Sequence, residues 1–233
     1  MLEVAALDAW YGQAQILYGV SLAVNAGECV ALVGRNGAGK STTMKAIMGL
    51  VAKRRGRIVF RGHDITSMPA YRIGRLGLGW VPEDRRIFTD LTVRENLAVA
   101  KQPKREGAPE WTHERLYTLF PNLGAMPDRP GGRMSGGEQQ MLTVARTLMG
   151  NPYLVLLDEP SEGVAPIIVE EMVGMITALK AAGVAILLSE QNLHFARLVS
   201  DRAVVLEKGE VRFEGAMEAL MNDETLLRTH LSV

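Results

Sequence analysis

A short glycine-rich pattern near the N-terminus constrains this chain more than any other feature. The segment Gly34-Arg35-Asn36-Gly37-Ala38-Gly39-Lys40-Ser41 fits the pattern G-x-x-x-x-G-K-[ST], and it follows the apolar run Cys29–Val33. The apolar run predicts a buried strand, and residues 42–50 after the pattern predict a helix. A strand, a glycine-rich loop and a helix in this order are typical of a site for the phosphates of a nucleotide.

The residue types in this loop explain how it would hold phosphate. Glycine lets the backbone turn tightly and aim successive N–H groups at phosphate oxygens. Lys40 can reach the β- and γ-phosphates, Ser41 can ligate Mg²⁺, and the start of the helix adds the positive end of its dipole. A glycine-rich turn without a ligand is the alternative. We expect a nucleoside triphosphate, bound by Gly34, Asn36, Gly37, Gly39, Lys40, Ser41 and Thr42.

Composition narrows the class of protein. At 233 residues the chain is long enough for one domain with a substantial core, and Lys+Arg and Asp+Glu balance at 26 each. This balance gives no general attraction to nucleic acid. The longest apolar runs are too short to cross a bilayer, and no signal peptide is visible at the N-terminus. We therefore expect cytoplasmic residence and a membrane role only through a partner. The single cysteine, Cys29, is expected to be a buried packing residue.

The order of predicted elements indicates an α/β fold. Residues 2–7 and 16–24 predict a short antiparallel sheet, with residues 25–28 as a hairpin turn before the Cys29 strand. The basic residues 53–57 predict a solvated turn, residues 56–60 with Asp64 an edge strand, and residues 78–81 a return to the core. Strands at 153–157 and 184–189 alternate with helices at 167–182 and 193–200, which predicts a mainly parallel sheet, and 202–214 resembles a hairpin.

The middle of the chain departs from this alternation. From residue 83 to about 148 strand signals are few, and helices are predicted at 93–100, 112–120 and 138–148, with an exposed loop at 101–110. We therefore predict one domain over residues 1–233, with a helical subdomain at 84–148 inserted into the core.

Two acidic residues close the apolar strand at 153–157. Asp158 and Glu159 would project at the carboxyl end of a central strand, where ligands bind in such sheets. Asp158 can hold Mg²⁺ through its water shell, and Glu159 can polarise a water molecule for attack on the γ-phosphate. An acidic turn alone is a weak signal, but the glycine-rich loop more than a hundred residues upstream strengthens it.

A third motif lies between the first two. Ser135, Gly136 and Gly137 precede the predicted helix at 138–148 and give a second helix N-terminus with exposed N–H groups, which is another anion site. One chain cannot easily bring both sites to one nucleotide. A head-to-tail dimer solves this, with Ser135 and Gly137 of one subunit closing over the nucleotide of the other.

The order of phosphate loop, Ser-Gly-Gly segment and apolar-Asp-Glu strand end resembles the nucleotide-binding subunit of ABC transporters over nearly the whole chain. Residues 81–88, 158–166 and 189–192 are similar to the shorter of the two ATPases in branched-chain amino-acid uptake systems, and urea or amide importers share much of this pattern. The resemblance implies an ATPase that uses ATP and Mg²⁺, and ATP-driven dimer closure that powers import.

The resemblance also implies partners and a location. They are two transmembrane permease subunits, a second ABC ATPase in a heterodimer or an identical copy in a homodimer, and an external solute-binding protein that acts through the permease. Nucleic acid is not expected. The chain would lie at the cytoplasmic face of the inner (plasma) membrane, and the segment around residues 85–96 would grip the permease.

Three further residues take roles from the resemblance. Tyr11 occupies the place of an aromatic that stacks on adenine, with an ordinary sheet-packing tyrosine as the alternative. Glu83 stands where most relatives have a glutamine that senses Mg²⁺ and the permease. It could ligate the metal or a permease arginine, or it could weaken the site by repelling the phosphates. Gln191 stands where most have a histidine that contacts the γ-phosphate. An amide cannot carry a proton, which leaves Glu159 as the base, with Lys40 and Gln191 as the other catalytic residues.

Other functions stay open at this point. A soluble ABC ATPase of DNA repair or translation usually has a long coiled-coil insertion or a second cassette, and this sequence has neither. The ATPase of a lipid or polysaccharide exporter is another alternative. A module that does not hydrolyse ATP is disfavoured because Lys40, Ser41, Asp158 and Glu159 are all present. The sequence does not identify the solute.

Overall fold

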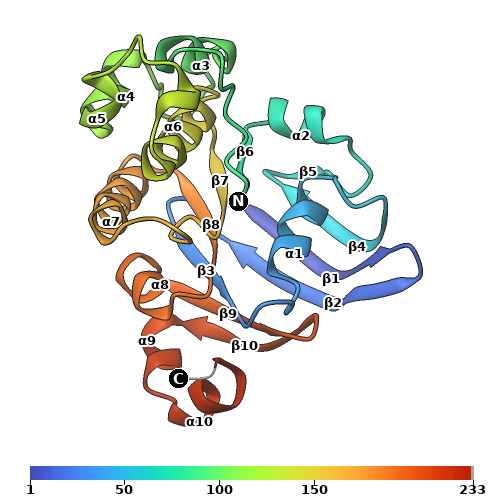
Figure 1. Ribbon diagram of the computed structural model, residues 1–233. Helices are drawn as coiled ribbons and strands as arrows, with labels where there is room; N and C mark the ends of the chain where they lie inside the picture. Colours follow the sequence, from blue (N-terminus) through green and yellow to red (C-terminus); the bar gives the residue numbers. More distant parts are fainter. Residues whose placement is uncertain (232–233) are drawn as a thin grey trace.

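Two sheets with helices around them make up the computed structural model, which describes residues 1–231 (Figure 1). One sheet has four strands in the order β2-β1-β4-β5, and the other has six in the order β10-β9-β3-β8-β7-β6. Helix α1 (Lys40–Ile47) packs between them. No helix within residues 1–231 is both long enough and apolar enough to cross a membrane.

The four-stranded sheet is antiparallel, as predicted for the N-terminal segment. It consists of β1 (Leu2–Tyr11), β2 (Ala14–Val24), β4 (Lys53–Phe60) and the two-residue β5 (His63–Asp64). Alternate apolar residues of β1 point inward, which is the period of a sheet with one buried face.

Three local predictions for this region are wrong. The basic residues 53–57 belong to β4 and not to a turn; Lys53 and Arg55 lie over the Trp10 ring, 5.0 and 5.8 Å from its centroid. Strand β4 is an interior strand, because β5 pairs with its outer side. Residues 25–28 do not turn a hairpin: they lead from β2 into β3 of the other sheet, whereas β1 and β2 meet around Gly12.

The six-stranded sheet is mainly parallel, as predicted. Strands β3 (Cys29–Val33), β6 (Leu78–Val81), β7 (Leu154–Asp158), β8 (Ala185–Glu190) and β9 (Arg202–Glu207) run parallel, and β10 (Glu210–Ala216) forms a hairpin with β9. Strand β7 is buried on both faces: Leu154 and Leu156 join the apolar cluster on one side, and Val155 and Leu157 join the cluster on the other. Such a sheet presents the carboxyl ends of several strands at one edge.

Helices cover both faces of this sheet. Helices α7 (Pro166–Ala181) and α8 (Leu193–Val199) lie close to the predicted bounds, and the short α2 (Ala70–Arg75) was not predicted. After β10 come α9 (Met217–Met221), α10 (Glu224–Leu226) and a π-helical turn (Leu227–Leu231).

The predicted insertion is helical and lies at one end of the molecule (Figure 1). It contains α3 (Val93–Val99), α4 (His113–Leu119), α5 (Pro121–Gly124), a 3₁₀ turn (Gly131–Arg133) and α6 (Gly136–Leu148). Thr92 and Ser135 each begin a helix with a capping box, in which side chain and backbone exchange hydrogen bonds.

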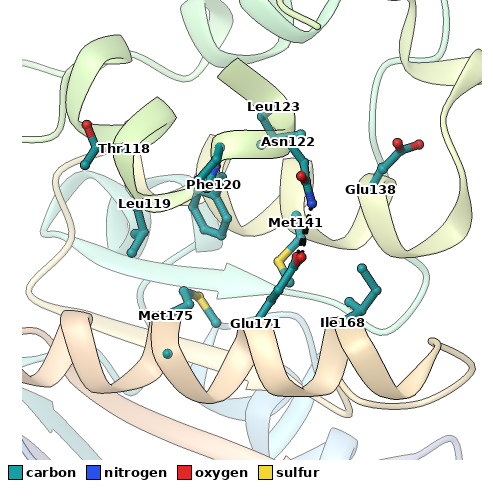
Figure 2. Close-up of a pocket in the computed structure, with 12 residues that line it drawn as sticks. Thr118, Leu119, Phe120, Asn122, Leu123, Glu138, Met141, Ile168, Glu171 and Met175 are labelled. Atoms are coloured by element: carbon teal, nitrogen blue, oxygen red, sulfur yellow. Dashed lines mark hydrogen bonds between the residues drawn. The ribbon is translucent and has the colours of Figure 1, made fainter. Parts of the chain in front are cut away.

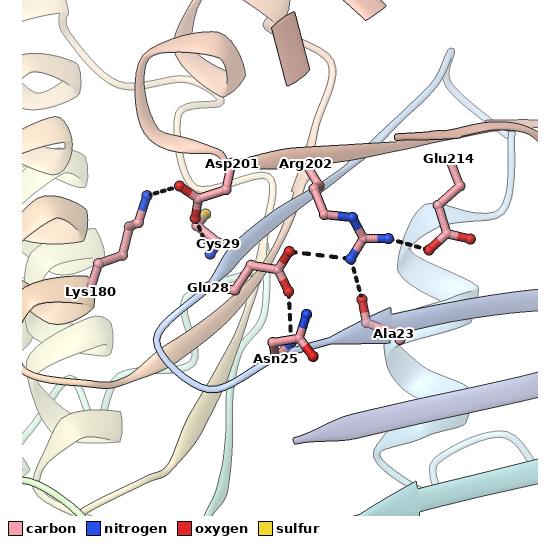
Figure 3. A network of polar contacts seen from close by, with 8 residues as sticks. All are labelled: Ala23, Asn25, Glu28, Cys29, Lys180, Asp201, Arg202 and Glu214. Carbon is pink, nitrogen blue, oxygen red and sulfur yellow. Dashed lines mark hydrogen bonds and ion pairs between the residues drawn. The ribbon is translucent and has the colours of Figure 1, made fainter. Parts of the chain in front are cut away.

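A polar network joins the amino ends of β3 and β9 to neighbouring elements (Figure 3). Arg202 of β9 pairs with Glu28 at 3.2 Å, and Lys180 of α7 pairs with Asp201 at 2.7 Å. Asp201 also accepts the backbone N–H of Cys29 at 2.8 Å. Burial raises the pKa of the Cys29 thiol to about 12, so this cysteine stays protonated and packs as an apolar residue.

Candidate active site

The phosphate loop (residues 34–41) connects β3 to α1, and its glycines are required by geometry. A Cβ atom on Gly34 would lie 2.3 Å from the carbonyl oxygen of Leu206 on β9. Gly39 has a φ of 109°, and a Cβ there would lie 2.7 Å from a methyl group of Leu17. Gly37 has a φ of 78° with open space around it. The loop is therefore packed tightly behind and is open in front, where a ligand would lie.

Lys40 crosses this loop and reaches the acidic residue that follows β7. Its ammonium nitrogen donates to the Gly34 carbonyl at 2.8 Å and lies 3.1 Å from Oε1 of Glu159. Both side chains are buried. The predicted phosphate-binding lysine and the predicted base thus form a buried ion pair.

Glu159 is held on both carboxylate oxygens and at its backbone. Gln191 donates from Nε2 to Oε2 at 2.6 Å, and the Glu159 N–H donates to the Ser189 carbonyl at 3.0 Å. Its φ of 47° is in the left-handed region, which is uncommon for a residue with a side chain. Burial works to raise the pKa of Glu159, but its contacts with Glu162, Gln191 and Lys40 together hold the pKa below its usual value. Glu159 is therefore ionised at neutral pH, as a base must be.

Asp158 and Ser41 meet beside this pair. The Ser41 hydroxyl donates to Oδ1 of Asp158 at 2.9 Å. Burial raises the pKa of Asp158, and the hydrogen bond from Ser41 opposes that shift. A hydroxyl and a carboxylate oxygen are hard ligands that suit Mg²⁺, which usually takes one or two carboxylates and completes its shell with water and substrate phosphates. No group of three or more His, Cys, Asp and Glu with metal-site geometry occurs in residues 1–231.

These residues line a cavity of about 420 Å³. The cavity brings together nine of the predicted site residues, and Tyr11 is half exposed at its wall. Gln191 lines an adjoining hollow with Glu159, whereas Gly34 and Asp158 line neither space. The nine residues are Tyr11, Asn36, Gly37, Gly39, Lys40, Ser41, Thr42, Glu83 and Glu159.

The Ser-Gly-Gly segment does not join this cavity. Ser135 caps α6 and accepts the Glu138 N–H at 3.3 Å, while Glu138 accepts the Ser135 N–H at 2.7 Å. A Cβ on Gly136 would lie 2.7 Å from the Arg85 guanidinium, and one on Gly137 would lie 2.7 Å from Ile168. None of the three lines the phosphate cavity of its own chain. Their action on the nucleotide of a second subunit stays a prediction.

Sequence reasoning assigned no role to two acidic residues at the site. Glu190 ends β8, and its carboxylate accepts the N–H of Ser161 at 3.0 Å and that of Asn192 at 3.3 Å. Burial raises the pKa of Glu190 to about 7. Glu162 lines the phosphate cavity itself. An available signal was that Glu190, like Asp158, ends a buried parallel strand.

A second cavity, of about 390 Å³, lies between the helical subdomain and α7 (Figure 2). Phe120 and Met141 from the subdomain and Met175 of α7 line it. Asn122 of α5 faces Glu171 of α7 across the gap and donates to both of its carboxylate oxygens, at 3.2 and 3.3 Å. The exposed polar pair thus bridges α5 and α7 beside an apolar space.

Comparison with known sequences places this site in a family. The family model described as "ABC transporter" matches residues 17–162, which include the phosphate loop and the Asp158-Glu159 strand end. The high-affinity branched-chain amino acid transport ATP-binding protein BraG of Pseudomonas aeruginosa is 39% identical over 231 residues, covering 99% of each chain. The lipopolysaccharide export system ATP-binding protein LptB of Haemophilus influenzae is 36% identical over 95% of this chain and 92% of its own.

Solved structures agree with the fold. An ATP-binding subunit of an ABC transporter superposes with a TM-score of 0.82 at 31% identity, covering 100% of this chain and 96% of that one. A nucleotide-free ATP-binding cassette superposes with a TM-score of 0.83 at 26% identity, covering 100% and 98%. The predicted α/β fold, with its antiparallel N-terminal sheet and inserted helices, is confirmed. The family match and the full-length identity together show that this chain belongs to the ATP-binding subunits of ABC transporters, which are ATPases.

Proposed function

We propose that this chain is the ATP-hydrolysing subunit of an importer for branched-chain amino acids or related small polar solutes such as urea or amides. The observation that carries the proposal is the 39% identity to BraG along 99% of both chains. Identity that extends to both ends favours a shared assembly more than a shared nucleotide site alone would.

The residues of the cavity have the chemistry that hydrolysis needs. Lys40 is placed to bind phosphate oxygens once it turns from Glu159, and Glu159 is ionised and can orient and deprotonate a water molecule. Gln191 can hold Glu159 or a phosphate oxygen by hydrogen bonding, but it transfers no proton. Ser41 and Asp158, with Glu83 in the same wall as Ser41, would hold Mg²⁺, which would neutralise charge on the phosphates.

The second subunit would complete the site. In this proposal Ser135, Gly136 and Gly137 present the N-terminus of α6 to the nucleotide of a partner ATPase, either a second copy or a different subunit. Dimer closure around ATP would move two membrane-spanning permease subunits at the cytoplasmic face of the membrane, with the segment at 85–96 as the contact. An external binding protein would deliver the solute.

A second candidate is supported by one specific observation. The 36% identity to LptB over 95% of this chain is nearly as high as that to BraG, so an ATPase for lipopolysaccharide export is the alternative. Both candidates share the same nucleotide chemistry and differ in the permease that is attached.

The test replaces the native chain by a Glu159→Gln variant in its own cells. This substitution keeps the size of the side chain and removes the base, so purified protein should release phosphate at least about a hundredfold more slowly. Uptake of radiolabelled leucine or urea should fall with it, while the lipopolysaccharide of the cell surface stays normal. Glu170→Gln removes an exposed carboxylate from α7 outside the cavity and serves as the control.

One result would overturn the importer assignment, and another would overturn the role of Glu159 as the base. Unchanged uptake of amino acids, urea and amides with depleted surface lipopolysaccharide would favour the exporter. Full hydrolysis by Glu159→Gln would show that another group activates the water. Tagged protein should also co-purify from detergent-solubilised membranes with two multi-span permeases.

A further inference from the structure

Glu162 is an acidic residue of the phosphate cavity with no part in the function described so far. The loop that carries it begins at Glu159, and the Glu162 N–H donates to the Glu159 carbonyl at 3.1 Å. The left-handed backbone at Glu159 and at Gly163, whose φ is 64°, bends the loop tightly. The bend returns Glu162 to the wall that Lys40 and Glu159 also line.

The charge of this wall is predominantly negative. Glu83, Glu159 and Glu162 line the cavity, and Lys40 is the one basic side chain that the described residues contribute to it. Lys40 is already paired with Glu159. The neighbouring Glu159 carboxylate raises the pKa of Glu162, with burial and Glu83 adding to the shift. Glu162 is thus in an environment that opposes further negative charge.

The carboxylate of Glu162 lies against the carboxylate of Glu159, which carries the same charge. It forms no ion pair with any Lys, Arg or His of residues 1–231, and the bend is made by backbone hydrogen bonding. A structural role for the charge is therefore not visible, whereas an effect on an anionic ligand follows directly from its position.

We propose that Glu162 is a specificity-determining residue of the nucleotide site, whose carboxylate opposes the terminal phosphate of a triphosphate and so lowers the preference of the single subunit for ATP over ADP. The inference rests on the proposed ATP site. ADP lacks the phosphate that would come nearest to Glu159 and Glu162, so repulsion acts mainly on ATP.

The test measures ATP and ADP affinity of the full chain by titration calorimetry, with Mg²⁺ omitted so that hydrolysis does not interfere. Glu162→Gln should tighten ATP binding about tenfold and ADP binding less than about threefold at low salt. The difference should shrink at about 0.5 M NaCl, because this exposed charge is screened. Glu162→Ala should repeat the effect, and Glu162→Asp, which keeps the charge, should resemble the wild type.

The control is Glu170→Gln, which removes one carboxylate from α7 away from the cavity and should change neither affinity. Equal changes for ATP and ADP, or no change in folded Glu162→Gln and Glu162→Ala, would overturn the inference while leaving the ATP site intact. Wild-type protein that binds no ATP would overturn the proposed function together with this inference.

Discussion

The buried ion pair of Lys40 and Glu159 gives a stability prediction that needs no nucleotide. The two charged groups lie 3.1 Å apart, and the side chains are 3% and 8% exposed. Lys40→Met keeps a long side chain but leaves Glu159 without its counter-ion. Breaking a buried pair on one side costs about 3–5 kcal/mol. Since Gln191 still donates to Glu159, we expect the free energy of unfolding to fall by about 3 kcal/mol at pH 8.

A double variant removes the buried carboxylate charge that Lys40→Met leaves without a counter-ion. In Lys40→Met with Glu159→Gln, no buried carboxylate remains at this position, and we expect about 2 kcal/mol of the loss to return. Urea unfolding followed by circular dichroism gives the four free energies of the double-mutant cycle. In the Lys40→Met single variant, Glu159 loses the lysine contact that lowers its pKa, so the folded-state pKa should rise relative to the wild type. The stability deficit should therefore shrink as the pH falls and the carboxylate gains a proton.

Two results would refute this reasoning. A coupling energy below about 0.5 kcal/mol would mean that the two groups act independently. Coupling that disappears at about 1 M NaCl would mean that solvent ions reach the pair and that it is not buried. Loss of ATP hydrolysis in Lys40→Met is expected in every case, so activity alone cannot decide the matter.

Three further predictions concern single positions. Burial raises the pKa of Glu190 from 4.5 to about 7, so between these pH values the folded protein keeps a proton that the unfolded chain releases. The free energy of unfolding therefore falls as the pH rises through this range. Glu190→Gln should lack this component of about 3 kcal/mol in urea titrations across pH 4–8. Gly34→Ala brings a methyl group to 2.3 Å from the Leu206 carbonyl and should cost about 2 kcal/mol while weakening ATP binding in calorimetry. Asn122→Ala removes an exposed bridge to Glu171; it should cost less than about 1 kcal/mol but speed hydrogen exchange in α5.

The sequence predicts those parts of the site that are local in the chain. The phosphate loop is one continuous segment, and its glycines, Lys40 and Ser41 follow from their spacing. Asp158 and Glu159 follow from an apolar run that ends in two acids. The parallel core follows from alternating apolar strands and helices, because strands buried on both faces are uniformly apolar.

Contacts between distant segments could not be predicted in the same way. Residues 25–28 have the composition of a hairpin turn, yet composition does not state which sheet receives the next strand. Basic residues 53–57 look solvated, but a strand with one exposed face accommodates them, and Trp10 covers two of the cations. The hydrogen bond from Gln191 to Glu159 joins the ends of β7 and β8, and only the register of these strands brings the two residues together.

The balance of charge at the cavity connects the proposed nucleotide chemistry to the state of the ion pair. With Lys40 paired to Glu159, a triphosphate in the cavity would face carboxylates and no free cation among the described lining residues. Binding therefore requires Lys40 to exchange Glu159 for phosphate, and the carboxylate that it leaves still has the Gln191 amide on its other oxygen. In the proposed function, loss of the lysine contact raises the basicity of Glu159 at the moment when a water molecule must be deprotonated. The same exchange favours ATP that arrives with Mg²⁺, because the metal supplies the positive charge that the wall lacks.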